Sequence, residues 1–192
     1  MQELDRNTSY VSIELSNAWD MFMRSYFLSC ALGSRTASGT RVRLLNHAGF
    51  QSTEDAIKYS VVQLNRRHRG GPIGRRDEPE WSKSNLLTLS AGLGFTNLAQ
   101  ISTAFSTPTA TFEQLRWARN FYAHRNDDTV TRMKLLARGL KRPHPRSRQA
   151  TTLLNAPPVR LRTLQSGSIK RGSLVLSDWI AELSNLASDL SL

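Results

Sequence analysis

Acidic residues are absent from a long stretch of this chain. No Asp or Glu lies between Asp128 and Asp178, whereas that interval contains eleven of the 26 Lys and Arg residues. The other 15 cations match the 15 acidic residues of the rest of the chain, so the whole net charge of +11 resides in this interval. A block of one sign favours contact with a polyanion, because neutralised phosphates release condensed counterions. The alternative is a solvated loop that only keeps the protein soluble.

Cysteine, long apolar runs and cofactor motifs are also scarce. Cys30 is the only cysteine, which excludes an internal disulfide or a cysteine-rich metal site and favours a reducing cytosol. No stretch approaches the ~20 apolar residues of a membrane helix, and the acidic-polar start lacks the pattern of a signal peptide. Phosphate-binding glycine loops, zinc-ligand spacings and paired catalytic carboxylates are missing too. We therefore expect a cytoplasmic protein with no membrane segment, no metal and no cofactor.

Apolar residues recur at helical spacing along most of the chain. Such spacing, with 39% hydrophobic residues and modest numbers of Gly and Pro, predicts one all-α domain over residues 1–192. The first helix is long and amphipathic and ends near Gly33, and a capping box of Thr111 and Gln114 opens the fifth. The expected helices cover residues 11–33, 53–64, 82–91, 95–105, 112–124, 128–140 and 177–190.

The segment before the last helix differs in composition. Pro, Arg, Ser and Thr dominate residues 141–172, which predicts a basic arm or extended insertion within the domain. The last helix has a stripe of apolar residues that is too apolar to remain exposed, so we expect it to fold back. Together these features predict an all-α bundle with a basic Pro/Arg-rich insertion before the C-terminal helix.

The stretch Arg119-Asn120-Phe121-Tyr122-Ala123-His124 gathers three side chains suited to phosphodiester chemistry. An arginine fork neutralises phosphate oxygens, and an imidazole with an ordinary pKa near neutrality moves a proton. On the predicted helix, Leu115, Ala118 and Tyr122 would face a core. Arg116, Asn120 and His124 would follow a polar line on another face.

This Arg-Asn-x-x-Ala-His pattern resembles the central motif of HEPN domains, all-helical proteins of which many are ribonucleases in bacterial toxin and phage-defence systems. The resemblance implies a HEPN-like up-and-down helical bundle. It also implies that Arg119 holds the scissile phosphate, that His124 acts as general base or acid, and that Asn120 orients His124 or the phosphate by hydrogen bonding. The attacking group would be the ribose 2′-hydroxyl and the product a 2′,3′-cyclic phosphate, with no metal required. We expect further RNA contacts from a set of cations near and beyond the motif: Arg116, Arg125, Lys141, Arg142, Arg146 and Arg148.

Helix geometry complicates this assignment. Arg119 lies about 140° from His124 around an ideal helix at roughly 100° per residue. The two side chains converge only if the arginine bends round, the helix deforms, or a second copy supplies one partner. HEPN ribonucleases typically form dimers whose motifs face across one cleft, so a homodimer is expected. In one toxin subgroup a tyrosine two residues after the histidine is modified, but Asn126 stands there in this chain.

Other interpretations compete with a ribonuclease. The motif is short and loose, and a single helical histidine is more often a surface or core residue than a catalyst. A catalytically silent HEPN-like module would bind RNA or a partner protein, such as an antitoxin, and use Arg119 and Asn120 structurally. An unrelated helical DNA-binding protein ranks last, because no helix-turn-helix pattern is present. Trp81, beside a charged loop, is a minor candidate for stacking on a base.

Overall fold

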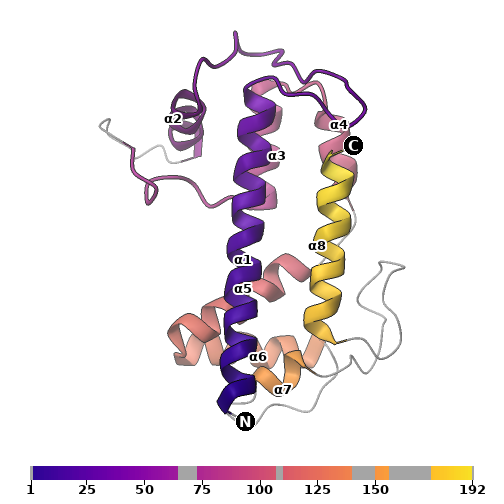
Figure 1. Cartoon of the computed structure of the whole chain (residues 1–192). Coiled ribbons are helices and arrows are strands. Elements are labelled where there is room, and N and C mark those ends of the chain that lie inside the picture. Colours follow the sequence, from indigo (N-terminus) through magenta and orange to yellow (C-terminus); the bar gives the residue numbers. More distant parts are fainter. Residues whose placement is uncertain (1, 65–72, 107–109, 140–149, 156–173, 192) are drawn as a thin grey trace. The chain divides into compact units, whose positions relative to one another are not determined.

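The computed structural model describes residues 2–64, 73–106, 110–139, 150–155 and 174–191, and these residues form an all-α protein (Figure 1). Apart from two isolated bridges, no β-structure occurs in these ranges. The predicted fold class is thus confirmed. The helices are α1 (Gln2–Ala31), α2 (Thr53–Leu64), α3 (Lys83–Leu93), α4 (Leu98–Ala104), α5 (Thr111–His124), α6 (Asp127–Gly139), α7 (Ala150–Leu154) and α8 (Val175–Ser191).

The chain divides into two compact units. Unit 1 comprises residues 1–18 and 107–186, and unit 2 comprises residues 19–106 and 187–192. The first part of α1 and most of α8 therefore belong to unit 1, together with α5, α6 and α7. Unit 2 contains the second part of α1, the end of α8, and α2, α3 and α4.

In unit 1, α5 packs on α6 and is hydrogen-bonded through its side chains to α8. Leu115 and Ala118 of α5, Leu136 of α6 and Trp179 of α8 are all almost completely buried. The indole N–H of Trp179 donates to Gln114 Oε1 at 3.2 Å, and the Thr111 hydroxyl donates to the Glu182 carboxylate. Buried polar groups need such partners, because an unmade hydrogen bond in the interior is costly.

The start of α5 differs from the sequence prediction. Its N-cap is Ala110, with no side-chain capping bond, so the expected capping box of Thr111 and Gln114 is wrong. Both residues are buried, and their polar atoms pair with α8. A capping pattern in sequence cannot distinguish a residue that caps its own helix from one that bonds a distant helix.

Unit 2 has an aromatic core, and its helix α3 is capped at both ends. The Phe27 ring of α1 lies 5.4 Å from the Trp81 ring and 5.9 Å from the Phe95 ring, measured between centroids. Helix α3 packs on α2 and on α4. Ser82 caps α3, and Gly94 ends it with a left-handed φ of 65°, where a Cβ atom would lie only 3.0 Å from Asn46. Glycine is therefore required at this turn.

Most expected helices appear close to their predicted places. The first helix begins earlier than its apolar stripe, and the helix expected at 95–105 begins only at Leu98. Within the predicted arm at 141–172, the structure describes residues 150–155, where α7 forms and Leu153 and Leu154 are buried. The rest of that interval lies outside the described residues. The arm and the single domain over 1–192 therefore stay predictions.

None of the described helices has a span of sufficient length and hydropathy to cross a lipid bilayer.

Candidate active site

The motif residues lie at the carboxyl end of α5, where two helices meet in a tight turn. His124 is the last residue of α5, and Arg125 follows with a left-handed φ of 44° while its N–H donates to Phe121 O at 2.9 Å. Asn126 then caps α6, since its Oδ1 accepts from the Thr129 N–H at 3.0 Å and its own N–H donates to Thr129 Oγ1. The two caps fix the backbone on both sides of the turn.

Asn126 corrects one detail of the sequence prediction. The sequence alone predicts Asp127 or Asp128 as the cap of this helix, but both are exposed residues of its first turn. Asn126 also stands where some HEPN toxins carry the modified tyrosine. In this chain that position has a structural function at the start of α6.

Arg119 and Asn120 bond to each other. Arg119 Nη1 donates to Asn120 Oδ1 at 3.0 Å, and both side chains are half-buried. The bond draws the guanidinium towards Asn120, which lies one turn before His124. An arginine donates through five N–H groups, so the remaining ones are still available to phosphate oxygens.

His124 is exposed, and no described residue makes a hydrogen bond or ion pair with its imidazole. Arg119 and His124 belong to one unbroken α-helix, so deformation of the helix does not bring them together. The arginine does bend towards Asn120, but its hydrogen bond is to that residue and not to His124. Arg119 and Asn120 are therefore brought together, whereas His124 stands one turn away without a contact to Arg119.

A polar network supports the turn from the other side. Arg125 Nη2 lies 3.2 Å from Asp5 Oδ2, and the Thr151 hydroxyl donates to Asp5 Oδ1. The Tyr122 hydroxyl lies 3.1 Å from Thr151 Oγ1, and Asn155 Nδ2 donates to Thr8 Oγ1 at 2.7 Å. These bonds join α1, α5 and α7 within unit 1.

Burial in this network has an electrostatic effect. Burial raises the pKa of Tyr122 to about 12, with a smaller contribution in the same direction from the Asp5 charge. Tyr122 is therefore a neutral phenol at any physiological pH. Asp5 could not be predicted as part of this network, because nothing near it in the sequence indicates a partner 120 residues away.

The predicted RNA-binding cations divide into two groups. Arg116 is exposed on α5, and Arg125 is exposed but paired with Asp5. Lys141, Arg142, Arg146 and Arg148 lie outside the described residues. An exposed ion pair such as that of Arg125 contributes only about 0–1 kcal/mol, so a phosphate competes with Asp5 at little cost.

Trp81 is not a base-stacking platform. Its side chain is only 4% exposed, and its indole N–H donates to Glu78 Oε2 at 3.1 Å. Across the described parts of the chain, no cluster of His, Cys, Asp and Glu side chains is placed to hold a metal ion.

Comparisons with family models, with curated proteins and with solved structures gave no match to this chain.

Proposed function

We propose that the protein is a metal-independent endoribonuclease of HEPN type, with its active site at the carboxyl end of α5. The observation that carries the proposal is an exposed histidine, His124, one helical turn beyond an Arg119–Asn120 pair. The caps at Arg125 and Asn126 hold this helix end in place. A backbone fixed in this way favours catalysis, because reacting groups must be positioned to within a fraction of an ångström.

The reaction follows from the side chains. His124, as the neutral imidazole, removes the proton of a ribose 2′-hydroxyl, and the 2′-oxygen attacks the adjacent phosphorus. The bond to the 5′-oxygen of the next nucleotide breaks, and that oxygen takes up a proton. The products are a 2′,3′-cyclic phosphate and a 5′-hydroxyl. Arg119 stabilises the negative charge that grows on the phosphoryl oxygens, and Asn120 fixes the guanidinium.

A homodimer completes the site in this proposal. Arg119 and His124 point away from each other on an ideal helix, and the arginine contacts Asn120 rather than His124. If two α5 ends face each other, Arg119 of one chain and His124 of the other meet the same phosphate. The second arginine and histidine would form an equivalent site.

The biological setting is proposed from the resemblance. HEPN ribonucleases often serve as toxins or phage-defence effectors. Such an enzyme is kept inactive by an antitoxin, or stays inactive until a trigger activates it. The acid-free interval from Asp128 to Asp178 supports RNA as the polyanion. RNA and an inhibitory partner protein are therefore the proposed partners.

The direct test is incubation of purified protein with a labelled RNA pool in EDTA. We expect cleavage that leaves cyclic phosphate ends, that disappears in His124→Ala and that persists in Lys134→Ala. Lys134 is a matched control, since it is also exposed and lies on α6 in unit 1. An oligonucleotide of the same base sequence, with 2′-deoxyribose in place of every ribose, should resist cleavage. Cutting of that oligomer, or full activity of His124→Ala, would contradict the proposal.

A second candidate function has one observation in its favour. The Arg119–Asn120 hydrogen bond is what a structural role for these residues would require, with the protein acting as a silent RNA- or partner-binding module. In that case the purified protein would bind RNA without cutting it. Arg119→Ala would then lower the free energy of unfolding but leave RNA affinity unchanged.

A further inference from the structure

A short hairpin in unit 2 has an unusual charge arrangement. Residues 34–42 fold back on themselves, since Val42 N donates to Ser34 O and Thr36 N donates to Thr40 O, both at 2.9 Å. Gly39 permits the turn with a left-handed φ of 84°. The fold-back places Arg35 directly opposite Arg41 in an isolated antiparallel bridge. Like charges at directly opposed positions repel each other.

Neither arginine has an acidic partner in the described part of the chain. Arg35 Nη1 donates to Gly39 O at 2.8 Å and Arg41 Nε donates to Gly33 O at 3.2 Å, so both guanidiniums pair only with neutral carbonyls. In the same unit, Arg24 and Arg75 both bind the Glu78 carboxylate. Within the described residues, no acidic side chain therefore neutralises the positive charges of Arg35 and Arg41.

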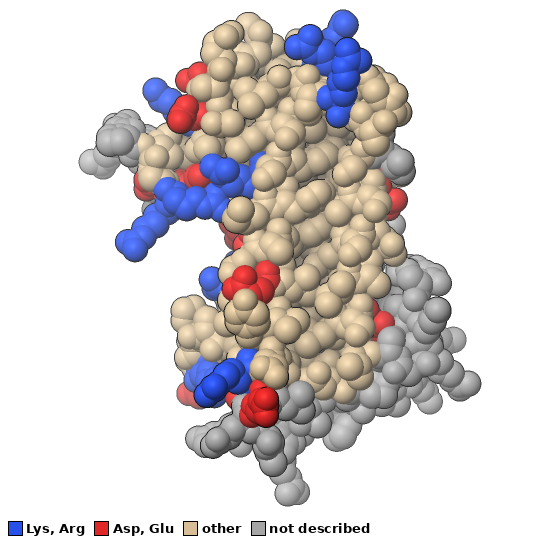
Figure 2. Space-filling model, in the orientation of Figure 1, with Lys and Arg blue, Asp and Glu red and all other residues tan. Residues whose placement is uncertain are grey.

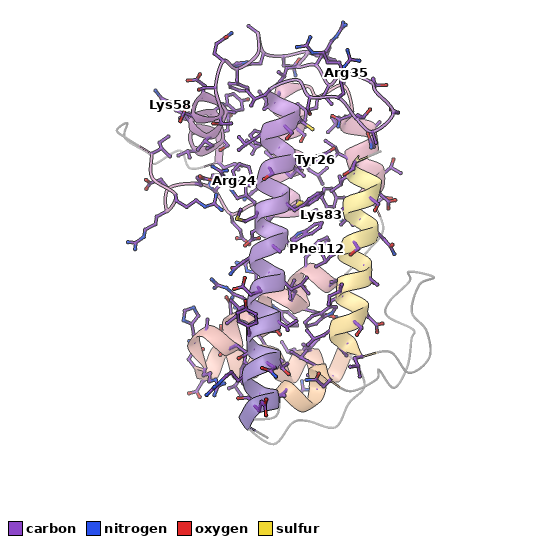
Figure 3. All side chains as sticks on the ribbon, in the orientation of Figure 1. Arg24, Tyr26, Arg35, Lys58, Lys83 and Phe112 are labelled. Atoms are coloured by element: carbon purple, nitrogen blue, oxygen red, sulfur yellow. The ribbon has the colours of Figure 1, made fainter. Side chains whose placement is uncertain are left out.

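The figures agree with this description. Figure 2 shows a blue group at the top of the view, in the region where Figure 3 labels Arg35, with no red atoms beside it. An anion is therefore the complementary ligand for this part of unit 2.

Two cavities adjoin the hairpin and share Thr36, Val42 and Asn97 in their walls. The first, of about 310 Å³, is lined by Arg41 and by four residues that carry hydroxyl groups, Thr36, Ser38, Thr40 and Thr96, among others. The second, of about 330 Å³, includes Arg35 and the aromatic rings of Phe22 and Tyr26. No Asp or Glu lines either cavity.

Asn97 stands in the wall common to both cavities. Its Nδ2 donates to the Tyr26 hydroxyl at 3.0 Å, whereas its Oδ1 is buried and has no partner among the described residues. Exchanging the two amide atoms would pair the oxygen with Tyr26 and leave the nitrogen unpaired instead. In either orientation the wall contains one unmatched polar atom, which is typical of a ligand site rather than of a packed core.

We propose that unit 2 binds a small phosphomonoester with a ring-shaped body. The phosphate would lie between Arg35, Arg41 and the hairpin hydroxyls, which together provide charge and hydrogen-bond donors for its oxygens. The ring would occupy the cavity lined by Phe22 and Tyr26, where it would stack on an aromatic face. This site is independent of the proposed ribonuclease, because all of its residues belong to unit 2.

The test is calorimetric titration of the whole protein with three probes: adenosine 5′-monophosphate, adenosine and inorganic phosphate. We expect the monophosphate to bind more tightly than either of the other two, because only it fills both cavities. Arg35→Ala and Arg41→Ala should each weaken its binding roughly 10- to 100-fold, as expected for a lost charged hydrogen bond. Arg76→Ala, an exposed arginine of the same unit that lines neither cavity, is the matched control.

A further variant separates the two parts of the site. Phe22→Leu should weaken binding of the monophosphate but leave the affinity for inorganic phosphate unchanged. Equal affinities for adenosine and its monophosphate would overturn the proposal, as would absence of binding by both phosphate probes. It would also be overturned if the two arginine variants lowered affinity for single-stranded RNA while the small probes failed to bind, since the hairpin would then contact an RNA backbone.

Discussion

The polar residues at the two ends of α5 differ in burial and in their hydrogen-bond partners. At the amino end, Thr111 and Gln114 are buried and satisfied by Glu182 and Trp179. At the carboxyl end, Asn120 is half-buried and His124 is exposed, and no residue of α8 is bonded to either. One end of the helix therefore serves folding, and the other leaves its polar groups available for chemistry. Substitutions at the two ends should separate stability from activity.

The largest effect is expected at the carboxyl end. His124→Ala and Arg119→Ala should each abolish RNA cleavage, since proton transfer alone typically contributes ~10²–10⁴ in rate. Circular dichroism should show an unchanged fold, because His124 is exposed and Arg119 is half-buried. Added imidazole should restore part of the activity of His124→Ala but none in Arg119→Ala. Undiminished cleavage by either variant would remove that residue from the catalytic assignment.

Mixing the inactive Arg119→Ala and His124→Ala proteins tests whether the carboxyl end of one α5 forms a complete active site by itself. In a dimer with shared sites, a mixed pair has one site that retains both Arg119 and His124, so activity should return on subunit exchange. If both residues act within one chain, the mixture stays inactive. Sedimentation of the wild type supplies the control, and a fully active monomer would exclude the shared site.

A smaller effect is expected for cations that lie outside α5. Changing Lys141, Arg142, Arg146 and Arg148 together to Ala should weaken RNA binding similarly for all sequences. The slope of log affinity against log salt should fall by about 0.7 for each lost phosphate contact on single strands. Cleavage at saturating RNA should persist. An unchanged affinity and salt slope would mean that RNA is held elsewhere.

The amino end of α5 should respond in stability. Trp179→Phe removes the N–H that Gln114 Oε1 accepts and should lower the free energy of unfolding by about 1–3 kcal/mol, as expected for a buried group left unpaired. Gln114→Met in the same background removes the unpaired acceptor and should recover part of the loss. Urea unfolding measures both. Cleavage at a temperature where the variants remain folded should be unaffected.

The smallest effect concerns pH and the network behind the site. The pKa of Tyr122 is raised to about 12, above its ordinary value near 10, so the native protein favours the neutral phenol. This contribution to stability is complete below about pH 10 and is lost as the pH rises from 10 towards 12. Tyr122→Phe should therefore flatten the decline of stability in alkali, measured by urea unfolding. An identical decline in wild type and variant would contradict the shift.

The sequence was sufficient for the helices but not for their polar contacts. Apolar spacing is a local property, and it located α2, α3 and α8 to within a few residues, whereas α1 begins well before its apolar stripe. The partners of Thr111 and Gln114, by contrast, lie 71 and 65 residues away on α8. No local pattern specifies such pairs, and a motif of two residues looked like a helix cap.

The candidate site was predicted in the same partial way. The spacing of Asn120 and His124 placed them one turn apart on a helix, which the structure retains. The pairing of Arg125 with Asp5, and of Arg35 with Arg41 across a hairpin, depends on how the chain returns on itself. No pattern in residues 34–43 predicts that Arg35 and Arg41 lie opposite each other, because that repulsion arises only when the chain folds back.

The single thiol of the chain has a practical consequence for labelling. Cys30 is the only cysteine, its side chain is buried, and burial raises its pKa. A thiol in that state reacts slowly with maleimides and similar reagents, because the thiolate is the nucleophile. One cysteine introduced at an exposed position such as Lys134 would therefore carry a probe almost exclusively, without removal of the native residue. Spin labels placed there would give the distance between two copies of α6 in solution, and thus a direct view of any assembly that forms around RNA.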